Sequence, residues 1–418
     1  MEGDGLPKAA SVVTHMQFGP SWGPNCTRVI RTALGRSANA QTHLLTSRSS
    51  PERPTRRKDK PTSLTRPVRR LAATTLAALA VALLAAAPQT AAAAATLGNA
   101  PGGLLALTAG RGQAYAVLGS GDPAVPFRLV RSTGRGASSI GRFGVRGARF
   151  PDVAAAAGSL VVAYGRVTSD GLLYESSLAQ AGGFEAHATL GQSTGPARLA
   201  LDGPARLVAF PDLLGDAVLG GRDATDAPVR ELLSNSAPAR RHMPLDLVVD
   251  DGRVLVLDLV QSATRSELCV VGPGAPARAV LSVPGVQALA ATLAYDGERL
   301  YVAYSARGRA VLASARPTPG ATWSRRRLAA HGRLAGAPAV ARVGLRTIVA
   351  TSERVDGQRE IYVTKIGPGG TVVSRLTRSR ADDLAPQATV GLDDTVYVGW
   401  TRRDRARSGA TALLQRVG

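Results

Sequence analysis

One apolar, strand-like segment recurs seven times between residue 95 and the end of this 418-residue chain. The copies read "GQAYAV", "SLVVAY", "ARLVAF", "RVLVLD", "RLYVAY", "RTIVAT" and "TVYVGW". Their last residues, the anchor residues, lie 46 to 49 residues apart and are Val117, Tyr164, Phe210, Asp258, Tyr304, Thr351 and Trp400. So steady a period indicates a repeat architecture in which each copy folds into one small unit that stacks on its neighbours.

Turn signals divide each repeat into four short apolar segments. In five copies a proline lies 13 or 14 residues before the anchor residue, at Pro151, Pro196, Pro244, Pro338 and Pro386. A turn containing Gly or Asp, such as "YDGE", separates the small-residue segment after the proline from the anchor segment, and two more apolar segments follow. Four short strands in about 47 residues are what one blade of a β-propeller requires.

The first residues of the repeat region predict how the ring closes. Residues 95–117 align without a gap on residues 188–210, which makes "ATLG" equivalent to the fourth strand of another repeat, whereas the seventh repeat ends at Gly418 without a fourth strand. We therefore predict an all-β, seven-bladed β-propeller of four-stranded blades over residues 96–418, closed by its N-terminal strand. A two-sheet sandwich is the alternative, but sandwich strands are not generally organised as sevenfold copies.

An export signal precedes the repeats. "RPVRR" at residues 66–70 is followed by the apolar run 71–86 and then by an alanine tract. A basic segment, a short apolar segment and small residues describe a secretory signal peptide, predicted here over residues 68–95. Sixteen residues rich in Ala and Leu are short for a membrane span and Pro88 follows at once, so we expect no permanent span. Arg69 and Arg70 leave the general secretory and twin-arginine routes both open.

Residues 1–67 precede this signal, although a signal normally begins at the initiator methionine. They are rich in proline and basic residues and lack apolar periodicity, so we expect them to be disordered. Val68 could be an initiating GTG codon, which would make residues 1–67 a gene-model extension. A basic cytoplasmic tail before a signal anchor is the alternative.

Charge suggests anionic partners. Residues 96–418 hold 38 basic against 26 acidic residues, and all the basic ones are Arg except Lys365. GC-rich coding favours Arg, so the number of arginines alone says little, but such a domain attracts anions. We expect an anionic cell-wall polymer, a polysaccharide or another envelope protein as partner, and not nucleic acid. Cys269 is the one cysteine of this region and is predicted to be a small buried residue.

The repeats resemble those of secreted β-propeller proteins of high-GC Gram-positive bacteria, whose units carry a "DG-x-x-V-A-Y/W" strand. That resemblance implies an exported propeller and carries no catalytic residue. "PGATWS" resembles the Asp-box of sialidase-type propellers through Gly320, Thr322 and Trp323, but Thr318 stands where the box has its Asp. Because that box is a folding element, one degenerate copy implies the fold and not the activity.

Two acids are the plausible catalytic candidates. A glycosidase needs two carboxylates that converge on one bond, and Asp152 and Asp246 lie on the predicted first strands, which line the channel. Asp246 could equally face a neighbouring blade or bond a loop amide. The sequence contains no nucleophile elbow, phosphate loop or zinc spacing, so we expect no metal or cofactor. His187, His242 and His331 are predicted to be surface loop residues.

The best binding feature follows from topology. Loops between second and third strands lie on the same face as loops that lead into the next blade. A group of arginines falls in these loops, here named the basic sector: Arg307, Arg354, Arg378, Arg402, Arg403 and Arg405. They form either an anion-binding face or a solvated surface balanced by nearby acids. We predict a monomeric, non-enzymatic binding or scaffold module at or outside the cell envelope, with a polysaccharide-active hydrolase or lyase as the alternative.

Overall fold

The computed structural model describes residues 93–417 except 157, 181–182, 235–239, 288 and 405–408. The predicted extension at 1–67 and nearly all of the predicted export signal lie outside these residues. Every regular element in the described part of the chain is a β-strand. No helix there is long and apolar enough to cross a membrane.

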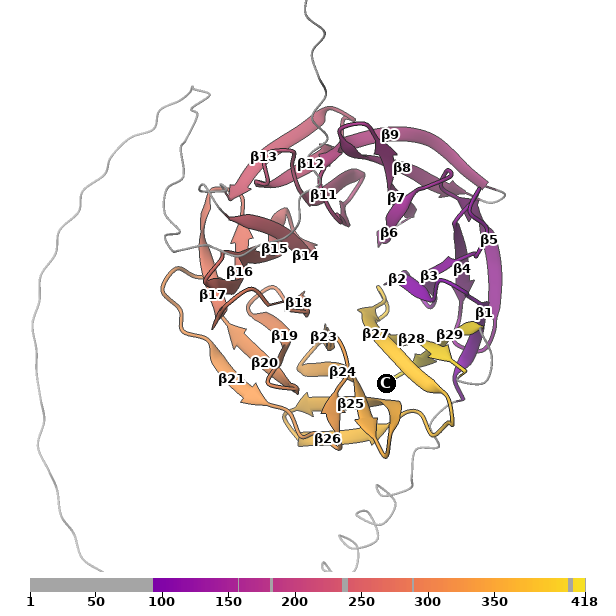
Figure 1. The fold of residues 1–418 in the computed structure, drawn as a ribbon, viewed down its shortest axis with the longest axis vertical. Helices are drawn as coiled ribbons and strands as arrows, with labels where there is room; N and C mark the ends of the chain where they lie inside the picture. The colour runs from indigo at the N-terminus through magenta and orange to yellow at the C-terminus, as the bar shows by residue number, and fades with distance from the viewer. Residues whose placement is uncertain are drawn as a thin grey trace, which may run out of the picture. The chain divides into compact units, whose positions relative to one another are not determined.

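Seven antiparallel sheets form the blades of a ring, with the first strand of each blade nearest the centre (Figure 1). Blade 1 contains β2 (Leu104–Ala109), β3 (Ala114–Gly119), β4 (Phe127–Ser132) and β5 (Ala137–Phe143), and blade 2 contains β6 (Arg149–Ala156), β7 (Ser159–Thr168), β8 (Gly171–Gln180) and β9 (Gly183–Ser193). Blade 3 contains β10 (Arg198–Asp202), β11 (Ala205–Pro211), β12 (Ala217–Arg222) and β13 (Pro228–Ser234), and blade 4 contains β14 (Arg241–Asp250), β15 (Arg253–Gln261), β16 (Arg265–Gly272) and β17 (Ala275–Pro284).

The remaining three blades follow the same order. Blade 5 contains β18 (Ala291–Tyr295), β19 (Leu300–Ala306), β20 (Arg309–Ala315) and β21 (Ser324–Arg327). Blade 6 contains β22 (Arg333–Leu334), β23 (Ala339–Val343), β24 (Arg346–Val355), β25 (Gln358–Gly367) and β26 (Gly370–Arg375), and both β22 and β23 pair with β24 as two pieces of one interrupted first strand. Blade 7 contains β27 (Asp382–Val390), β28 (Val396–Arg403), β29 (Ala410–Arg416) and β1 (Ala95–Asn99). The predicted seven-bladed propeller is confirmed.

The ring closes through β1, which pairs antiparallel with β29 as the outermost strand of blade 7. Ala95 lies opposite Leu414, and Ala100 N donates to Ala410 O at 2.8 Å just beyond the strand. Arg128 of blade 1 also donates to the carbonyl of Asn99 at 2.8 Å. The predicted closure by the strand that begins at "ATLG" is therefore confirmed.

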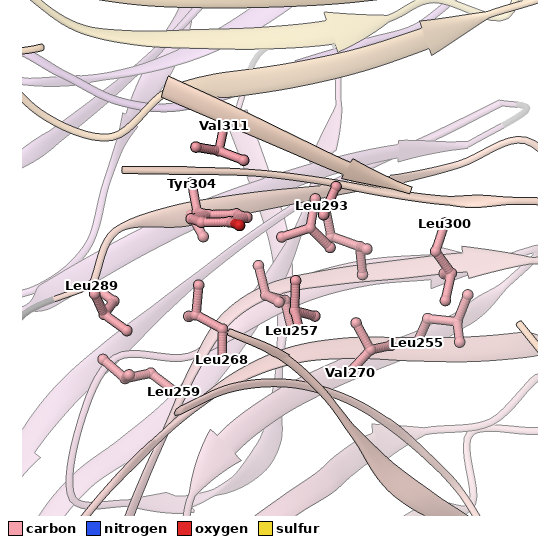
Figure 2. Close-up of a cluster of buried hydrophobic side chains, with 14 residues drawn as sticks. Leu255, Leu257, Leu259, Leu268, Val270, Leu289, Leu293, Leu300, Tyr304 and Val311 are labelled. Carbon is pink, nitrogen blue, oxygen red and sulfur yellow. The ribbon is translucent and has the colours of Figure 1, made fainter. Parts of the chain in front are cut away.

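The apolar core is divided among the seven junctions between blades. Each of seven buried clusters in the described residues draws its side chains from two adjacent blades. Figure 2 shows the cluster between blades 4 and 5, where Leu257 and Leu268 approach Leu293 and Tyr304. A single sheet would expose these faces to water, so the stability of each blade depends on its neighbours.

The anchor residues and the recurrent prolines have distinct structural places. All seven anchor residues lie in second strands and are at most 2% exposed. Pro151, Pro244 and Pro386 lie at irregularities in their first strands, and Pro338 ends the break between β22 and β23. Proline cannot donate to a sheet ladder, so it suits a position where pairing is already interrupted.

Candidate functional site

The first strands of blades 2 and 4 hold the two candidate catalytic acids, and their carboxylates bond neighbouring blades. Asp152 Oδ1 accepts from Val153 N at 2.9 Å, and its Oδ2 accepts from Leu199 N of blade 3 at 2.9 Å. Asp246 repeats the pattern with Leu247 N at 2.9 Å and Leu293 N of blade 5 at 2.8 Å. The bond to the next blade spans 47 residues in both cases. Of the two roles considered for Asp246, this geometry shows the bond to a neighbouring blade.

Two further polar residues continue these bonds between consecutive first strands. Arg198 Nε of blade 3 donates to Leu245 O of blade 4 at 2.6 Å. Thr292 Oγ1 of blade 5 accepts from Val340 N of blade 6 at 2.9 Å. Together with the two acids, these side chains link blades 2 to 6 in series. The repeat period could have revealed this position, because Asp152, Arg198, Asp246 and Thr292 are 46 to 48 residues apart.

The electrostatics of these acids are set mainly by burial. Burial raises the pKa of Asp246 to about 6, against the lowering effects of the Leu293 amide and of Arg198. The negative charge of Asp152 raises it further. Burial also raises the pKa of Asp152, and Arg198 again acts in the opposite direction. Arg198 thus lies between two carboxylates and compensates both.

The basic sector contains one arginine that is held by a buried acid. Arg402 Nε donates to Asp383 Oδ1 at 2.9 Å and its terminal nitrogen donates to Oδ2 at 3.2 Å. Trp400 Nε1 donates to the same carboxylate at 3.0 Å, and Asp383 is completely buried. Arg402 therefore compensates a buried charge at the junction of β27 and β28.

The other members of the basic sector differ from Arg402. Arg307, Arg354, Arg378 and Arg403 are all exposed, and none of them makes an ion pair with a described residue. Arg405 lies outside the described residues. The chain topology places them at the ends of second and fourth strands, on the face here named the 2–3 face. The opposite face, which carries the turns between first and second strands, is named the 1–2 face.

Glu353 directly precedes Arg354 of the basic sector, but it is buried and its carboxylate bonds a loop. Its Oε2 accepts from His331 N at 2.7 Å and from Gly332 N at 3.0 Å, and its Oε1 accepts from Thr351 Oγ1 at 3.0 Å. The carboxylate therefore fixes the entry into blade 6 and forms no ion pair with Arg354 among the described residues.

A buried His–Asp pair occupies blade 4. His242 Nδ1 lies 2.6 Å from Asp258 Oδ2, and both side chains are almost completely buried. Met243 N donates to the other oxygen of Asp258 at 3.0 Å. The prediction of a loop position is wrong for His187 and His242, because they lie within β9 and β14, whereas His331 is exposed as predicted. The missed signal was Asp258 itself, a charged residue at an anchor position.

The structure also places Cys269 and the segment that resembles an Asp-box. Cys269 is buried in β16, as expected for a small apolar residue. "PGATWS" forms the connection between β20 and β21, where Arg278 lies over the ring of Trp323 at 5.2 Å from its centroid. Among the described side chains, no group of three or more His, Cys, Asp and Glu is placed to hold a metal ion.

No protein-family model matches this sequence, and no curated protein matches it either. Solved structures resemble its fold at low identity. A protein from Lactobacillus plantarum is 12% identical, with a TM-score of 0.46, and the match covers 73% of this chain and 99% of that one. A subtype N11 neuraminidase-like protein from a flat-faced bat strain is 8% identical, with a TM-score of 0.41, covering 65% and 88% of the two chains.

A third match is a prolyl endopeptidase structure, 11% identical with a TM-score of 0.47, and it covers 82% of this chain but 54% of that chain. At identities this low, the likeness concerns the fold alone. The strand order identifies the chain as a seven-bladed β-propeller, and its distant structural neighbours include neuraminidase-like proteins.

Proposed function

We propose that this chain is an exported binding or scaffold module at or outside the cell envelope and that its propeller does not catalyse a reaction. The observation that supports this most directly is the bonding of Asp152 and Asp246. Both oxygens of each carboxylate accept backbone N–H groups, one of them from the next blade. A glycosidase needs carboxylates that reach the substrate, whereas these two hold first strands together.

A hydrolase is the second candidate, and one observation favours it. The pKa of Asp246 is raised to about 6, and a general acid must be protonated near the working pH. Asp152, the second carboxylate, is separated from Asp246 by blade 3, whose Arg198 compensates both.

A combined binding and turnover screen separates the two candidates. The full chain is applied to a glycan array, and the polysaccharides that bind are incubated with it and assayed for new reducing ends and for unsaturated products. We expect binding without turnover. Turnover that is lost in Asp246→Asn but retained in Asp251→Asn, an exposed turn residue in the same blade, would overturn the proposal in favour of the hydrolase or lyase.

A further inference from the structure

A pocket of about 530 Å³ opens on the 1–2 face between blades 1 and 2. Blade 1 contributes the β2–β3 loop, β3 and the junction of β4 and β5, while blade 2 contributes the β6–β7 turn and the end of β8. Leu392, in the β27–β28 turn of blade 7, forms an apolar rim. The hollow exists because small residues, Ala155, Ala156 and Gly158, occupy the side of blade 2.

The charge of this pocket is positive. Arg111 and Arg131 line it, both are exposed, and no Asp or Glu is among its described lining residues. Neither arginine makes an ion pair with any described residue. Arg131 Nε is held by Ser138 Oγ at 3.4 Å. Asp393 lies in the neighbouring turn of blade 7, where its carboxylate accepts from Thr395 Oγ1 at 2.8 Å, and it does not line the pocket.

The uncharged lining combines an aromatic ring with amide and hydroxyl groups. The ring of Tyr115 is half-buried, and its hydroxyl accepts from Gln113 Nε2 at 2.5 Å. Ser159 and Gln180 add polar groups from blade 2, where the amide nitrogen of Gln180 also donates to the carboxylate of Glu185, and Ile140 adds an apolar side chain. A sugar needs such a mixture, because its ring face packs on apolar surface while its hydroxyls need hydrogen-bond partners. The volume lies within the range of small-molecule sites.

We propose that this pocket binds an acidic saccharide, with the carboxylate or sulfate of the ligand at Arg111 and Arg131 and a sugar ring against Tyr115. Guanidinium groups bind such anions through charge-assisted, often paired hydrogen bonds. The inference rests on the proposed binding function and places its saccharide on the face opposite the basic sector.

Calorimetric titration of the full chain with trigalacturonate tests this site. We expect binding that weakens at least about tenfold for the fully methyl-esterified trimer and about tenfold in Arg111→Gln or Arg131→Gln, the effect of losing one charge-assisted hydrogen bond. Ser139→Trp, which fills the pocket from an exposed position, should abolish binding without changing the melting temperature. Arg146→Gln and Arg149→Gln remove equal charge from exposed positions outside both the pocket and the basic sector and should leave binding unchanged.

Each contrary result has its own meaning. Weakening by Arg354→Gln or Arg378→Gln, but not by the pocket variants, would overturn this site and leave the binding function intact. Competition by inorganic phosphate as strong as by trigalacturonate would overturn the saccharide as ligand. Failure to bind both trigalacturonate and a sulfated disaccharide would overturn the inference, whereas cleavage of either would overturn the non-enzymatic function.

Discussion

At the scale of single residues, the anchor position holds different residue types in different blades. It holds buried apolar or aromatic side chains in five blades and Thr351 in blade 6, but blade 4 carries Asp258 there. Asp258 is tolerated because His242 lies 2.6 Å away and Met243 N donates to it. A buried acid that loses one partner retains the cost of its desolvation.

We therefore expect His242→Ala to lower the free energy of unfolding by about 3 kcal/mol, since it removes a partner of a completely buried carboxylate. Equilibrium denaturation with guanidinium chloride measures the change. His331→Ala is the matched control, because His331 is exposed and stacks on Tyr362 at 4.6 Å between ring centroids. Equal stability of the two variants would contradict the structural role of the pair.

The hydrogen bonds between first strands predict that loss of Asp246 or Asp152 lowers stability. Asp246→Ala removes the acceptor of Leu293 N and should lower the free energy of unfolding by about 2 kcal/mol, the usual range for a hydrogen bond to a charged group. Asp152→Ala should behave similarly through Leu199 N. Denaturation curves of both, compared with Asp251→Asn, test this. Unchanged midpoints would mean that these carboxylates do not link the blades.

The pKa of Asp246 also predicts a pH dependence. Its pKa is raised from 3.8 to about 6 by folding, so the protonated form favours the folded state. That contribution is complete below about pH 4 and is lost as the pH rises through about 6. The stability of the wild type relative to Asp246→Asn should therefore fall between pH 4 and pH 7, by on the order of 1 kcal/mol or more. A difference that rises or stays constant over this range would contradict the assignment.

At the scale of elements, β1 is the strand on which ring closure depends. It covers the edge of β29 and contributes buried Leu97 to the core between blades 7 and 1, where Ala100 is also buried. Without it, β29 would present an unpaired edge.

A chain that begins at Gly102 should be less stable than one that begins at Thr96. The shorter chain loses β1 and buried apolar surface worth about 3 kcal/mol, which corresponds to a fall in melting temperature of roughly 4–5 °C for a domain of this size. Differential scanning calorimetry of the two chains measures it. A difference in melting temperature of only about 1–2 °C would correspond to much less than this ~3 kcal/mol. It would show that ring closure does not need β1.

At the scale of the whole molecule, the ring separates two charged surfaces. The basic sector lies on the 2–3 face, and the pocket that contains Arg111 and Arg131 lies on the 1–2 face. We propose that long-range attraction by the first and local recognition by the second act on the same anionic polymer. Arg402 belongs to neither function, because its guanidinium is held by Asp383.

Replacing Arg354, Arg378 and Arg403 together with Ser should reduce retention of the protein on isolated cell envelope and leave its melting temperature unchanged. The effect should shrink as salt concentration rises. A matched variant that replaces exposed Arg135, Arg146 and Arg149 removes the same charge from other positions. Equal retention of the two variants would reject a role for the basic sector. Arg402→Ser is excluded from the set because it would also destabilise the fold.

Much of the architecture could be predicted because its causes are local. The period of the anchor segments, the turn residues and the proline spacing indicated the number of blades, and the alignment of "ATLG" identified the closing strand. The surroundings of single residues could not be predicted in the same way. The sequence suggested a surface position for His242, because no nearby pattern indicates that Asp258, sixteen residues away, is its partner.

The sequence by itself therefore determined the fold: seven blades, their strand order and a ring closed by β1, because hydrophobic patterning and turn chemistry act over a few residues. Only the tertiary structure determined which partner each polar side chain bonds. Asp246 accepts a hydrogen bond from an amide 47 residues away, Arg402 donates to a buried acid, and residues of blades 1, 2 and 7 together line one pocket. The physical reason is that packing between blades selects these partners, and it joins positions that no local pattern connects.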